Sequence, residues 1–309
     1  MDKAKIYEKV QERYGLAAKS DDTAYGHRVA TAFGYTEEEL GSIPTDANLG
    51  LSCGNPLALA KLREGEVVID LGSGAGFDVF LAARKVGSKG RVIGIDMNKV
   101  FDHLQHLHSP VSKLNPFLLK DMLRRANENK EKAKADNVSF IESLITNVAL
   151  PDATADCIIS NCVVNLVPGT EKKLVFKEMF RLLTHGGRVA ISDILTKREL
   201  SQELKSNMAL YVGCIAGASQ VSDYEQYLRE AGFGDVLIVN SMNDLNTYAK
   251  AREESRGSQC CGERVEHACC QKAPSCCNDE NTASNTISES LNLDFNALAG
   301  SFKIYAVKE

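Results

Sequence analysis

The chain has 309 residues, of which 44% are hydrophobic and 25% are charged, a composition typical of a globular protein with a sizeable core. Its net charge of −5 argues against a polyanion partner such as nucleic acid, and no apolar run of membrane-spanning length is present. The amino terminus has no apolar segment of the kind found in secretory signals. We therefore expect a cytoplasmic protein whose ten cysteines serve as free thiols or as metal ligands.

The first expected element is a helix over residues 1–20, where apolar residues recur at helical spacing. Residues 21–50 look irregular apart from a short acidic helix, and Pro56 fits the first turn of the next helix. The apolar run that ends in "DLGSGAG" predicts a buried parallel strand. A helix and a second strand ending at Asp96 follow it, so this part of the chain is expected to form a βαβ unit.

Alternating helices and strands continue to the carboxyl terminus. Residues 98–136 predict a long polar helical connection, and the helix in "EKKLVFKEMFRLLTHGG" is expected to end in a Gly-Gly cap. Further strands are expected in "NVSFIESLI", "ADCIISNCVVNLV", "RVAISDIL", "DVLIVNS" and "SFKIYAVKE". The pattern predicts an α/β fold, with a mostly parallel seven-stranded sheet and helices on both faces.

A glycine-rich loop follows the first strand, and an acidic residue ends the second. Gly72, Gly74 and Gly76 would let a nucleoside approach the backbone closely, and Asp96 could accept hydrogen bonds from both ribose hydroxyls. The spacing in "DLGSGAG" departs from the G-x-G-x-x-G of a dinucleotide-binding domain, which is the alternative interpretation. The loop instead resembles the signature of class I S-adenosylmethionine (SAM) methyltransferases, which have a Rossmann-like fold.

This resemblance implies that SAM is the cofactor and gives it a set of contacts. Asp70 would lie near the methionine moiety of SAM, and Asp96 would bind its ribose. Met97 and Ile145 would pack on the two faces of the adenine, and Asn161 would contact the methionine end.

Three of the cysteines in the body of the chain lie where a substrate could reach them. Cys162 follows the fourth strand, at the sheet edge where open α/β proteins bind their substrates. Cys53 lies in "LSCGNP", an exposed-turn composition in which a free cysteine is a poor core residue. Cys214 lies among small residues, where helix packing is an equal explanation. Cys157 lies inside an apolar strand and is interpreted as a small buried hydrophobe.

Thiolates from these three separate segments could converge on the rim of the SAM site. Such a set suits a soft centre, namely Zn(II), Cu(I) or a trivalent metalloid such as As(III). Arsenic bound by three sulfur atoms keeps a lone pair that can attack the methyl carbon of a sulfonium. Zinc has no such lone pair and could only activate a thiol substrate.

The segments "LGLSCGNPLALA", "DLGSGAGFDVFLAA", "SNCVVNL" and "GCIAGA" together resemble the successive signatures of arsenite methyltransferases. The resemblance implies that Cys53, Cys162 and Cys214 hold a trivalent arsenical, which SAM methylates in arsenic detoxification. It also implies a thiol reductant, glutathione or thioredoxin. Many members carry a further cysteine upstream of the Cys53 motif, which can pair with it during turnover, and this chain has none there.

The resemblance also divides the chain into parts. Residues 1–65 would form an N-terminal helix and the substrate-binding cysteine loop, and residues 66–240 would form the SAM-binding core, with an arsenic-binding segment at about 196–222. Residues 241–300 are polar and cysteine-rich and are interpreted as a partly flexible insertion. Residues 301–309 would then be the final strand of the sheet.

Two further groups of residues are candidate metal ligands. The late cysteines form adjacent pairs, for which arsenic capture or redox chemistry is favoured over structural zinc because finger-type spacing is absent. The pairs are Cys260 with Cys261, Cys269 with Cys270, and Cys276 with Cys277. The histidines of "FDHLQHLHSP" do not share one helix face and are interpreted as solvated; they are His103, His106 and His108.

Two other functions stay open from the sequence. The chain could be a class I methyltransferase for another small acceptor, such as a sterol or quinone precursor, in which the three body cysteines only pack. It could also be a thiol-rich protein that binds a metalloid without catalysis, although the intact SAM signature argues against this.

Overall fold

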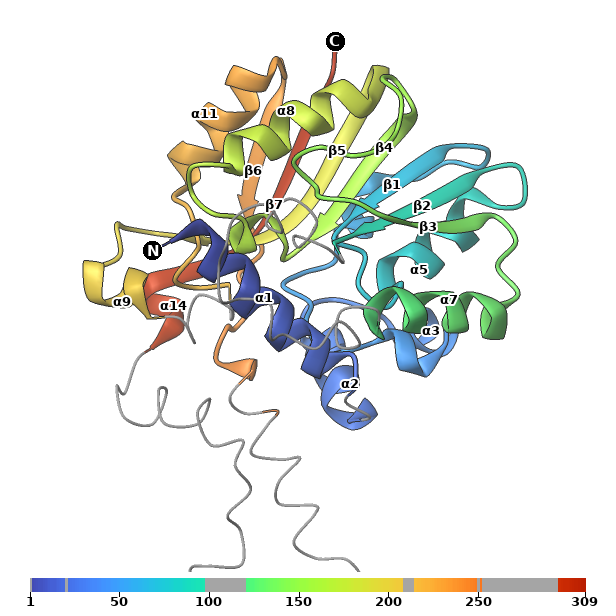
Figure 1. Ribbon diagram of the computed structural model, residues 1–309, viewed down its shortest axis with the longest axis horizontal. Helices are drawn as coiled ribbons and strands as arrows, with labels where there is room; N and C mark the ends of the chain where they lie inside the picture. The colour runs from blue at the N-terminus through green and yellow to red at the C-terminus, as the bar shows by residue number, and fades with distance from the viewer. Residues whose placement is uncertain (1, 20–21, 98–120, 208–213, 249–250, 252–293) are drawn as a thin grey trace, which may run out of the picture.

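The computed structural model describes residues 2–19, 22–97, 121–207, 214–248, 251 and 294–309 (Figure 1). The described residues contain one sheet of seven strands in the order β3-β2-β1-β4-β5-β7-β6. The strands are β1 (Val67–Leu71), β2 (Arg91–Asp96), β3 (Val138–Glu142), β4 (Ala155–Asn161), β5 (Leu183–Thr196), β6 (Val236–Asn240) and β7 (Ala299–Val307). All neighbours pair in parallel except β7, which runs antiparallel to both β5 and β6. The predicted α/β fold with a mostly parallel seven-stranded sheet is confirmed.

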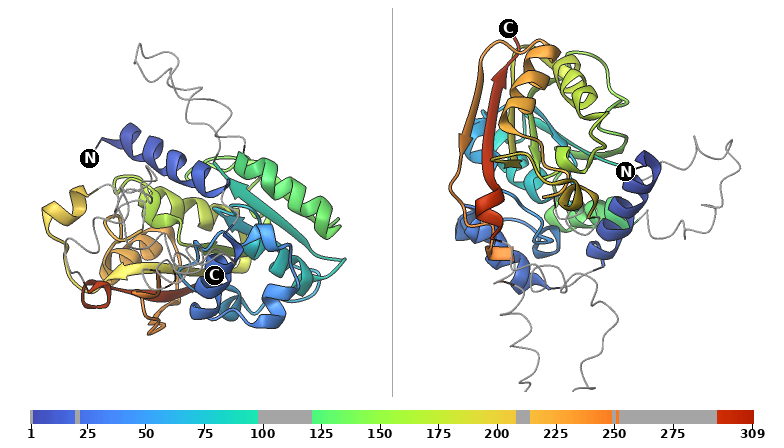
Figure 2. Two further views of the ribbon diagram at one scale, coloured as in Figure 1. Left: turned by 90° about the horizontal axis from the view of Figure 1, so that it is seen from below. Right: turned by 90° about the vertical axis from the view of Figure 1, so that its left-hand side faces the viewer.

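Helices cover both faces of the sheet (Figures 1 and 2). Those described are α1 (Lys3–Ala17), α2 (Thr23–Ala32), α3 (Glu37–Gly41), α4 (Leu57–Ala60), α5 (Phe77–Val86), α7 (Asp121–Ala133), α8 (Lys172–Leu182), α9 (Gln202–Ser206), α11 (Val221–Ala231) and α14 (Phe295–Leu298), with the 3-10 helices η1 (Thr45–Ala47) and η3 (Val164–Leu166). On one face, α8 and α11 share a hydrophobic core with the sheet. On the other face, α4 and α5 do the same.

The strand order places the candidate site. β1 is apolar except for Asp70 near its carboxyl end, because helices cover both of its faces. β2 lies on one side of β1 and β4 on the other, and open α/β sheets bind ligands at the carboxyl ends of strands where the order reverses in this way. In Figure 1 these carboxyl ends lie at the lower edge of the sheet, where α1 crosses.

The prediction of irregular structure over residues 21–50 is wrong at its start. α2 occupies this region, because the Asp22 side chain accepts a hydrogen bond from the Tyr25 backbone at 2.9 Å and so caps the helix. The sequence "TAYGHRVATA" contains a glycine and β-branched residues of low helix propensity. The burial of Val29 and Ala30, neither of which is exposed, therefore outweighs local propensity here.

The Gly-Gly cap predicted for α8 is also wrong. α8 ends at Leu182 and β5 begins at once, so Gly186 and Gly187 lie inside the strand. The Gly186 amide donates to the Lys308 carbonyl at 2.7 Å, and the Lys308 amide donates to the Gly187 carbonyl at 2.9 Å. Pairing with the residue that follows β7, which is remote in sequence, overrides the local cap signal. β7 itself begins at Ala299, slightly before the predicted final strand.

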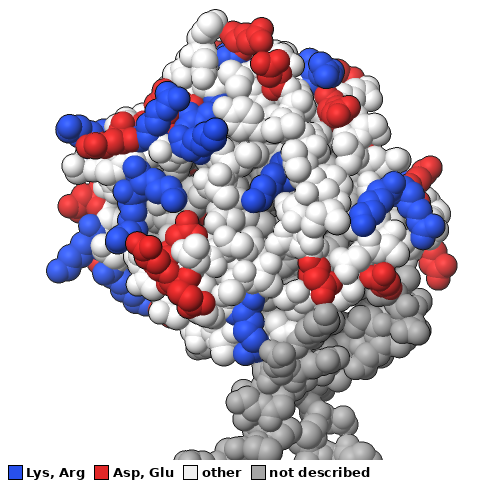
Figure 3. All heavy atoms as spheres, turned by 180° about the vertical axis from the view of Figure 1, so that it is seen from behind, with Lys and Arg blue, Asp and Glu red and all other residues white. Residues whose placement is uncertain are grey.

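The helices show no membrane-spanning segment among the described residues, and the surface shows no large patch of one charge on the face drawn in Figure 3. Within the described residues, no helix combines the length and the apolar character needed to cross a membrane. The face opposite to that of Figure 1 carries basic and acidic side chains in mixed positions (Figure 3). Mixed charges of this kind do not form a single-sign field on that face.

Arg188 fixes the segment that follows the Cys53 loop. Its side chain donates from Nε to the Ala60 carbonyl at 2.6 Å and from Nη2 to the Lys61 carbonyl at 3.0 Å. Both carboxylate oxygens of Glu66 accept from the same buried guanidinium at 2.9 Å. These contacts hold the end of α4 against β5 and so anchor the loop that carries Cys53.

Replacing Arg188 with methionine should lower the free energy of unfolding by roughly 3 kcal/mol, because it leaves the Glu66 charge and two backbone carbonyls buried without their partner. Urea unfolding measures this loss. The matched control is Arg91→Met, which removes an exposed arginine from β2 and should change stability by less than about 0.5 kcal/mol. Equal unfolding midpoints for the two variants would contradict the anchoring role of Arg188.

Candidate functional site

A pocket that is partly open to solvent lies at the carboxyl ends of β1, β2 and β4. Its walls come from the glycine loop after β1, from the segments after β2, β3 and β4, and from α1. Of the residues predicted to contact SAM, all but Gly76 line it: Asp70, Gly72, Gly74, Asp96, Met97, Ile145 and Asn161. Gly76 instead caps α5, where a Cβ atom would lie 2.5 Å from Phe80 and 2.9 Å from Phe140.

The glycine loop uses backbone conformations that other residues rarely adopt. Gly72 has a φ of +80°, and a Cβ atom there would lie 2.4 Å from the Val163 side chain. Gly74 has a φ of +53° and faces open space, while its amide donates to the Asp96 carboxylate at 2.7 Å. A ligand can therefore approach the loop backbone directly. Within the described residues, the buried Ser73 hydroxyl of this loop has no hydrogen-bond partner; it packs against β2, where a Cβ atom on Gly94 would lie 2.7 Å from it.

Three carboxyl groups line the pocket and lie close enough to interact. Burial raises the pKa of Asp96 to about 6, against hydrogen bonds from the Gly74 and Met97 backbone that lower it. Burial likewise raises the pKa of Asp78 to about 6. The pKa of Asp70 is raised well above its usual value by burial and by the charges of Asp78 and Asp96. Carboxylates crowded in this way favour a positively charged ligand beside them.

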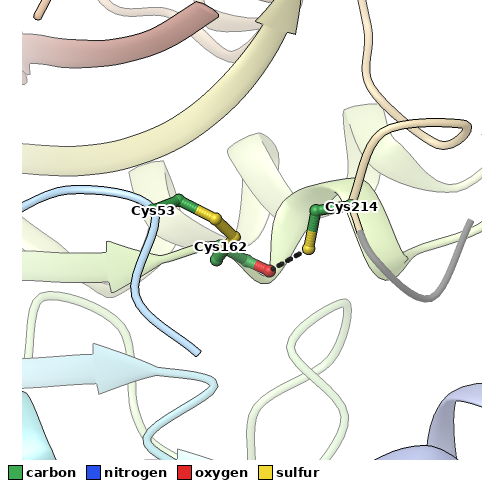
Figure 4. A group of neighbouring side chains, drawn as sticks. All are labelled: Cys53, Cys162 and Cys214. Carbon is green, nitrogen blue, oxygen red and sulfur yellow. Dashed lines mark hydrogen bonds between the residues drawn. A yellow bond between two sulfur atoms is a disulfide. The ribbon is translucent and has the colours of Figure 1, made fainter. Parts of the chain in front are cut away.

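Three cysteines from distant parts of the sequence meet beside this pocket (Figure 4). The sulfur atoms of Cys53, Cys162 and Cys214 all lie within 4.8 Å of one another. Cys53 comes from the loop before α4, Cys162 follows β4, and Cys214 lies in the segment before α11. Cys162 also lines the pocket itself. The structure thus brings together the three cysteines that the sequence singled out, and we call them the thiol cluster.

Two expectations about these cysteines are wrong. Cys53 is not in an exposed turn, because only 1% of its surface is exposed. Cys53 and Cys162 are not free thiols but form a disulfide, with Cα atoms 5.4 Å apart (Figure 4). The burial has a long-range cause: the Ser301 hydroxyl of β7 donates to the Cys53 carbonyl at 2.5 Å. The adjacent Gly54 packs so closely on β5 that a Cβ atom would lie 2.9 Å from Ser192.

Cys214 is the free thiol of the cluster. Its Sγ donates to the Cys162 carbonyl at 3.2 Å (Figure 4). Burial, together with the charge of Asp193, raises the pKa of Cys214 to about 12, so the thiol keeps its proton at neutral pH. Cys162 and Cys214 have φ values of +61° and +67°, a conformation that costs a non-glycine residue about 1–3 kcal/mol. Surrounding contacts must therefore hold both residues in place.

Cys157, the remaining cysteine among the described residues, lies outside the thiol cluster. Cys157 is fully buried inside β4, in the core shared with α4 and α5, and burial raises the pKa of its thiol to about 12. Its interpretation as a small buried hydrophobe is confirmed. The three late cysteine pairs and the three histidines of "FDHLQHLHSP" lie outside the described residues.

The side chain of Asn161 connects the pocket to the Cys53 loop. Its Oδ1 accepts a hydrogen bond from the Cys53 amide at 3.0 Å, and its Nδ2 donates to the Gly54 carbonyl at 2.9 Å. Nδ2 also lies 3.0 Å from Asp78 Oδ2 and 3.0 Å from the Tyr35 hydroxyl. Although Asn161 lines the pocket as predicted, its amide is therefore engaged with protein groups.

Two tyrosine hydroxyls that the sequence did not mark lie against the thiol cluster. The Tyr248 hydroxyl donates to the Ser52 carbonyl at 2.6 Å and to Cys53 Sγ at 3.6 Å. The Tyr14 hydroxyl lies 4.0 Å from Cys214 Sγ. Tyr14 belongs to the apolar stripe of α1 and Tyr248 to the segment interpreted as an insertion, so no local pattern identifies either residue.

Comparison with known proteins identifies the family. The sequence model of a methyltransferase domain matches residues 62–101 and 119–232. The arsenite methyltransferase of Halobacterium salinarum is 42% identical over 206 residues, which are 67% of this chain and 47% of that protein. The arsenite methyltransferase of Homo sapiens is 32% identical over 246 residues, which are 77% of this chain and 60% of that protein. The chain belongs to the arsenite methyltransferase family.

The fold agrees with this family. A solved arsenic(III) S-adenosylmethionine methyltransferase from Chlamydomonas reinhardtii matches with a TM-score of 0.51 at 24% identity, over 91% of this chain and 73% of that chain. At this identity the likeness shows the fold alone. The predicted class I, Rossmann-like methyltransferase fold is confirmed for this member of the arsenite methyltransferase family. The chain spans about half to three fifths of the length of the curated relatives it matches.

Replacing Asn161 with alanine should loosen the Cys53 loop, because it leaves the Cys53 amide, the Gly54 carbonyl and Asp78 without a shared partner. Each buried group that loses its partner costs roughly 1–3 kcal/mol. In the reduced protein, the rate at which a thiol reagent labels Cys53 should rise and the urea midpoint should fall. Asn147→Ala, at an exposed asparagine, is the control. Labelling of Cys53 at the original rate in Asn161→Ala would show that this amide does not hold the loop.

Proposed function

We propose that this chain is a SAM-dependent arsenite methyltransferase, which methylates trivalent arsenic held by Cys53, Cys162 and Cys214. The observation that carries the proposal is the meeting of three buried cysteines, with sulfur atoms within 4.8 Å of one another, at a pocket that Cys162 itself lines. Three soft ligands from separate segments form a site for a soft centre, which a packing role alone does not require. The names of the relatives support the same substrate.

The chemistry of the pocket fits SAM. Asp96 would accept hydrogen bonds from the ribose hydroxyls, and Met97 and Ile145 would pack on the adenine. Asp70 and the open glycine loop would receive the methionine end, where crowded carboxylates suit its positive charges. When bound, SAM supplies an electrophilic methyl group on a positively charged sulfur atom.

Arsenite would bind by condensation with neutral thiols. Arsenous acid, As(OH)₃, and three thiol groups give an arsenic tris-thiolate and three water molecules, with no net release of protons. The raised pKa of Cys214 therefore does not oppose binding, because each thiol proton leaves with a hydroxyl group of arsenic. The disulfide between Cys53 and Cys162 does oppose it, since both sulfur atoms must first be reduced to thiols.

The same disulfide fits the electron balance of methylation. Arsenic shares its lone pair with the methyl group, so its formal oxidation state rises from three to five. Two thiolate ligands can return these two electrons by leaving arsenic as a disulfide. Water then supplies a hydroxyl group to the arsenic and releases a proton, which gives a neutral trivalent methylated arsenical. Cys53 and Cys162 form such a disulfide. A thiol reductant must then restore both thiols in each cycle, and we propose glutathione or thioredoxin in the cytoplasm.

The parts of the chain would divide this work. Residues 1–65 supply α1 and the Cys53 loop, and residues 66–240 supply the SAM pocket, with Cys214 in the arsenic-binding segment at about 196–222. Residues 301–309 supply most of β7, whose Ser301 holds the Cys53 loop. The methionine end of SAM would rest on Asp70 rather than on Asn161, because the Asn161 amide is engaged with the Cys53 loop.

The direct test is to incubate the reduced full chain with arsenite, SAM and glutathione and to separate the arsenic species by chromatography. Methylated arsenic should form in proportion to demethylated SAM, and omission of glutathione should stop the reaction after about one turnover because the thiol pair stays oxidised. Absence of methylated arsenic, with SAM binding intact, would remove the proposed activity.

Replacing Cys162 with serine should reduce conversion of arsenite by at least about 100-fold, because a hydroxyl is a poor ligand for a soft centre. The binding of SAM should change little. Cys157→Ala is the matched control, since this second cysteine of the same region is equally buried but lies outside the thiol cluster. Similar arsenite turnover in Cys162→Ser and Cys157→Ala would show that the thiol cluster does not hold the substrate.

The affinity for SAM should fall with acidification. The pKa of Asp96 is about 6, so lowering the pH through this value protonates the group and removes the charged acceptor of the ribose hydroxyls. For one such proton, Kd should be constant above pH 7 and rise roughly tenfold per pH unit well below 6. Isothermal titration measures this. Asp96→Asn should bind SAM more weakly at pH 7.5 and show a flatter profile; an unchanged profile would exclude Asp96 as the titrating group.

A further inference from the structure

A buried lysine joins the two segments that carry Cys162 and Cys214. Lys172 begins α8, and its side chain is buried, with only 3% of the residue exposed. Its Nζ donates to Asn165 Oδ1 at 3.3 Å, to Ser219 Oγ at 2.9 Å and to the Gly217 carbonyl. Asn165 lies in η3, shortly after Cys162, whereas Gly217 and Ser219 follow Cys214. A single ammonium group therefore bridges both segments.

The bridge is tied to the sheet from the Asn165 side. Asn165 Nδ2 donates to Asp193 Oδ1 at 2.8 Å and to the Ile194 carbonyl at 2.5 Å. Asp193, on β5, is fully buried and also accepts from the Tyr224 hydroxyl of α11 at 2.7 Å. The lysine thus acts within a network that includes β5, η3 and α11. On the other side, Ser219 also accepts a backbone hydrogen bond from Thr196 of β5 at 2.9 Å.

Packing stability alone does not call for a lysine at this position. Burial lowers the pKa of Lys172 to about 8, which reflects the cost of removing its charge from water. An apolar side chain of similar length would fill the same space without this cost, and replacing buried charged groups by apolar ones is often neutral or stabilising. What an apolar side chain cannot do is hold three oxygen atoms from two segments in one fixed arrangement.

We propose that Lys172 is a positioning residue, which fixes the Cys214 segment against the Cys162 segment so that all three sulfur atoms can bind one arsenic atom. The role rests on the proposed function. Three bonds from one atom demand a small and well-defined triangle of sulfur atoms, and a misplacement of about 1 Å can cost a reaction roughly 100-fold. Cys162 and Cys214 both have positive φ values, so neither segment would keep its place by local preference.

Binding of an arsenical by Cys53 and Cys162 alone should not depend on Lys172. The Cys53 loop is held by Asn161, and the Cys162 amide donates to the Ser192 carbonyl of β5 at 2.9 Å. The thiol pair of Cys53 and Cys162 is therefore positioned without the lysine. Arsenous acid has three hydroxyl groups to exchange for thiols, whereas monomethylarsonous acid, CH₃As(OH)₂, has two. Loss of Lys172 should weaken the first ligand much more than the second.

The experiment compares Lys172→Met with Lys173→Met, its exposed neighbour in α8, using the reduced full chain. Arsenite and monomethylarsonous acid are titrated separately by the ultraviolet absorption of arsenic–sulfur bonds, and SAM by calorimetry. In Lys172→Met, Kd for arsenite should rise at least about tenfold, while Kd for monomethylarsonous acid and for SAM should stay within about twofold. Lys173→Met should match the original protein for all three ligands.

Ser219→Ala provides a second variant in case Lys172→Met does not fold. It removes one of the three acceptors and should weaken arsenite binding by roughly threefold, with SAM affinity unchanged. Original arsenite affinity in every folded variant of this pair would overturn the proposal. So would an equal loss for arsenite, monomethylarsonous acid and SAM, because that result indicates a general structural role.

The failure of this proposal is distinct from failure of the proposed function. If the original protein binds no arsenite, the proposed function fails and the role of Lys172 fails with it. If the original protein binds and methylates arsenite but Lys172→Met binds it equally well, only the role of Lys172 fails. Steady-state kinetics supply an independent check: kcat with arsenite should fall in Lys172→Met while KM for SAM stays constant.

Discussion

The side chain of Asn161 is the contact on which the candidate site depends. Its amide oxygen accepts from the Cys53 backbone, and its amide nitrogen reaches the Gly54 carbonyl and the Asp78 carboxylate. Asn161 is also the last residue of β4, so the next residue, Cys162, begins where the strand ends. One amide therefore fixes the distance between the cofactor pocket, the Cys53 loop and the second sulfur atom. Ser301 supports the same loop from β7, but Asn161 is the side chain that contacts both the loop and the carboxylate of Asp78 in the pocket.

The two halves differ in their electrostatics, and the difference matches their proposed ligands. The pocket half contains the buried carboxyl groups of Asp70, Asp78 and Asp96, whose crowding favours a positively charged ligand. In its oxidised form the thiol half is uncharged at neutral pH, because burial keeps the proton on Cys214 and Cys53 is paired with Cys162. Arsenous acid is itself uncharged and exchanges hydroxyl groups for thiols with loss of water. It can therefore enter a buried site without bringing a charge that the protein would have to compensate.

Those parts of the molecule that depend on local sequence could be predicted. The strands of the sheet are recognisable as apolar runs. The glycine loop together with Asp96 identifies the pocket, because the loop needs backbone conformations that glycine provides locally. The burial of Cys53 could not be predicted in this way. The composition of "LSCGNP" is that of a turn, and its burial comes from Ser301 and Tyr248, which lie more than a hundred residues later. The Gly-Gly cap was wrongly predicted for the same reason, since the partner of Gly186 is Lys308, which follows β7.

Lys172 likewise shows that burial caused by tertiary contacts cannot be predicted from the local sequence. A lysine in the first turn of a polar-faced helix is expected to be solvated, as Lys173 is, and only the tertiary structure shows that Lys172 is buried. Cys53 and Lys172 both make contacts that join segments distant in the sequence. The elements themselves were recognisable, but the contacts that set the spacing of the thiol groups were not.

The thiol cluster is therefore held by polar contacts rather than by the preferences of its own residues. Cys162 and Cys214 stand in left-handed backbone conformations, which the free chain would rarely adopt. Asn161 supports the Cys53 side of the cluster, and Lys172 spans the segments of the other two cysteines. Hydrogen bonds are directional, whereas apolar contacts allow segments to slide past each other, so a satisfied buried polar network selects one arrangement. A centre bound by three sulfur atoms tolerates little variation in their spacing. The sulfur atoms come from three separate loops and must keep a fixed triangular arrangement. Burying an amide and an ammonium group beside the cluster costs free energy, but these groups hold that arrangement.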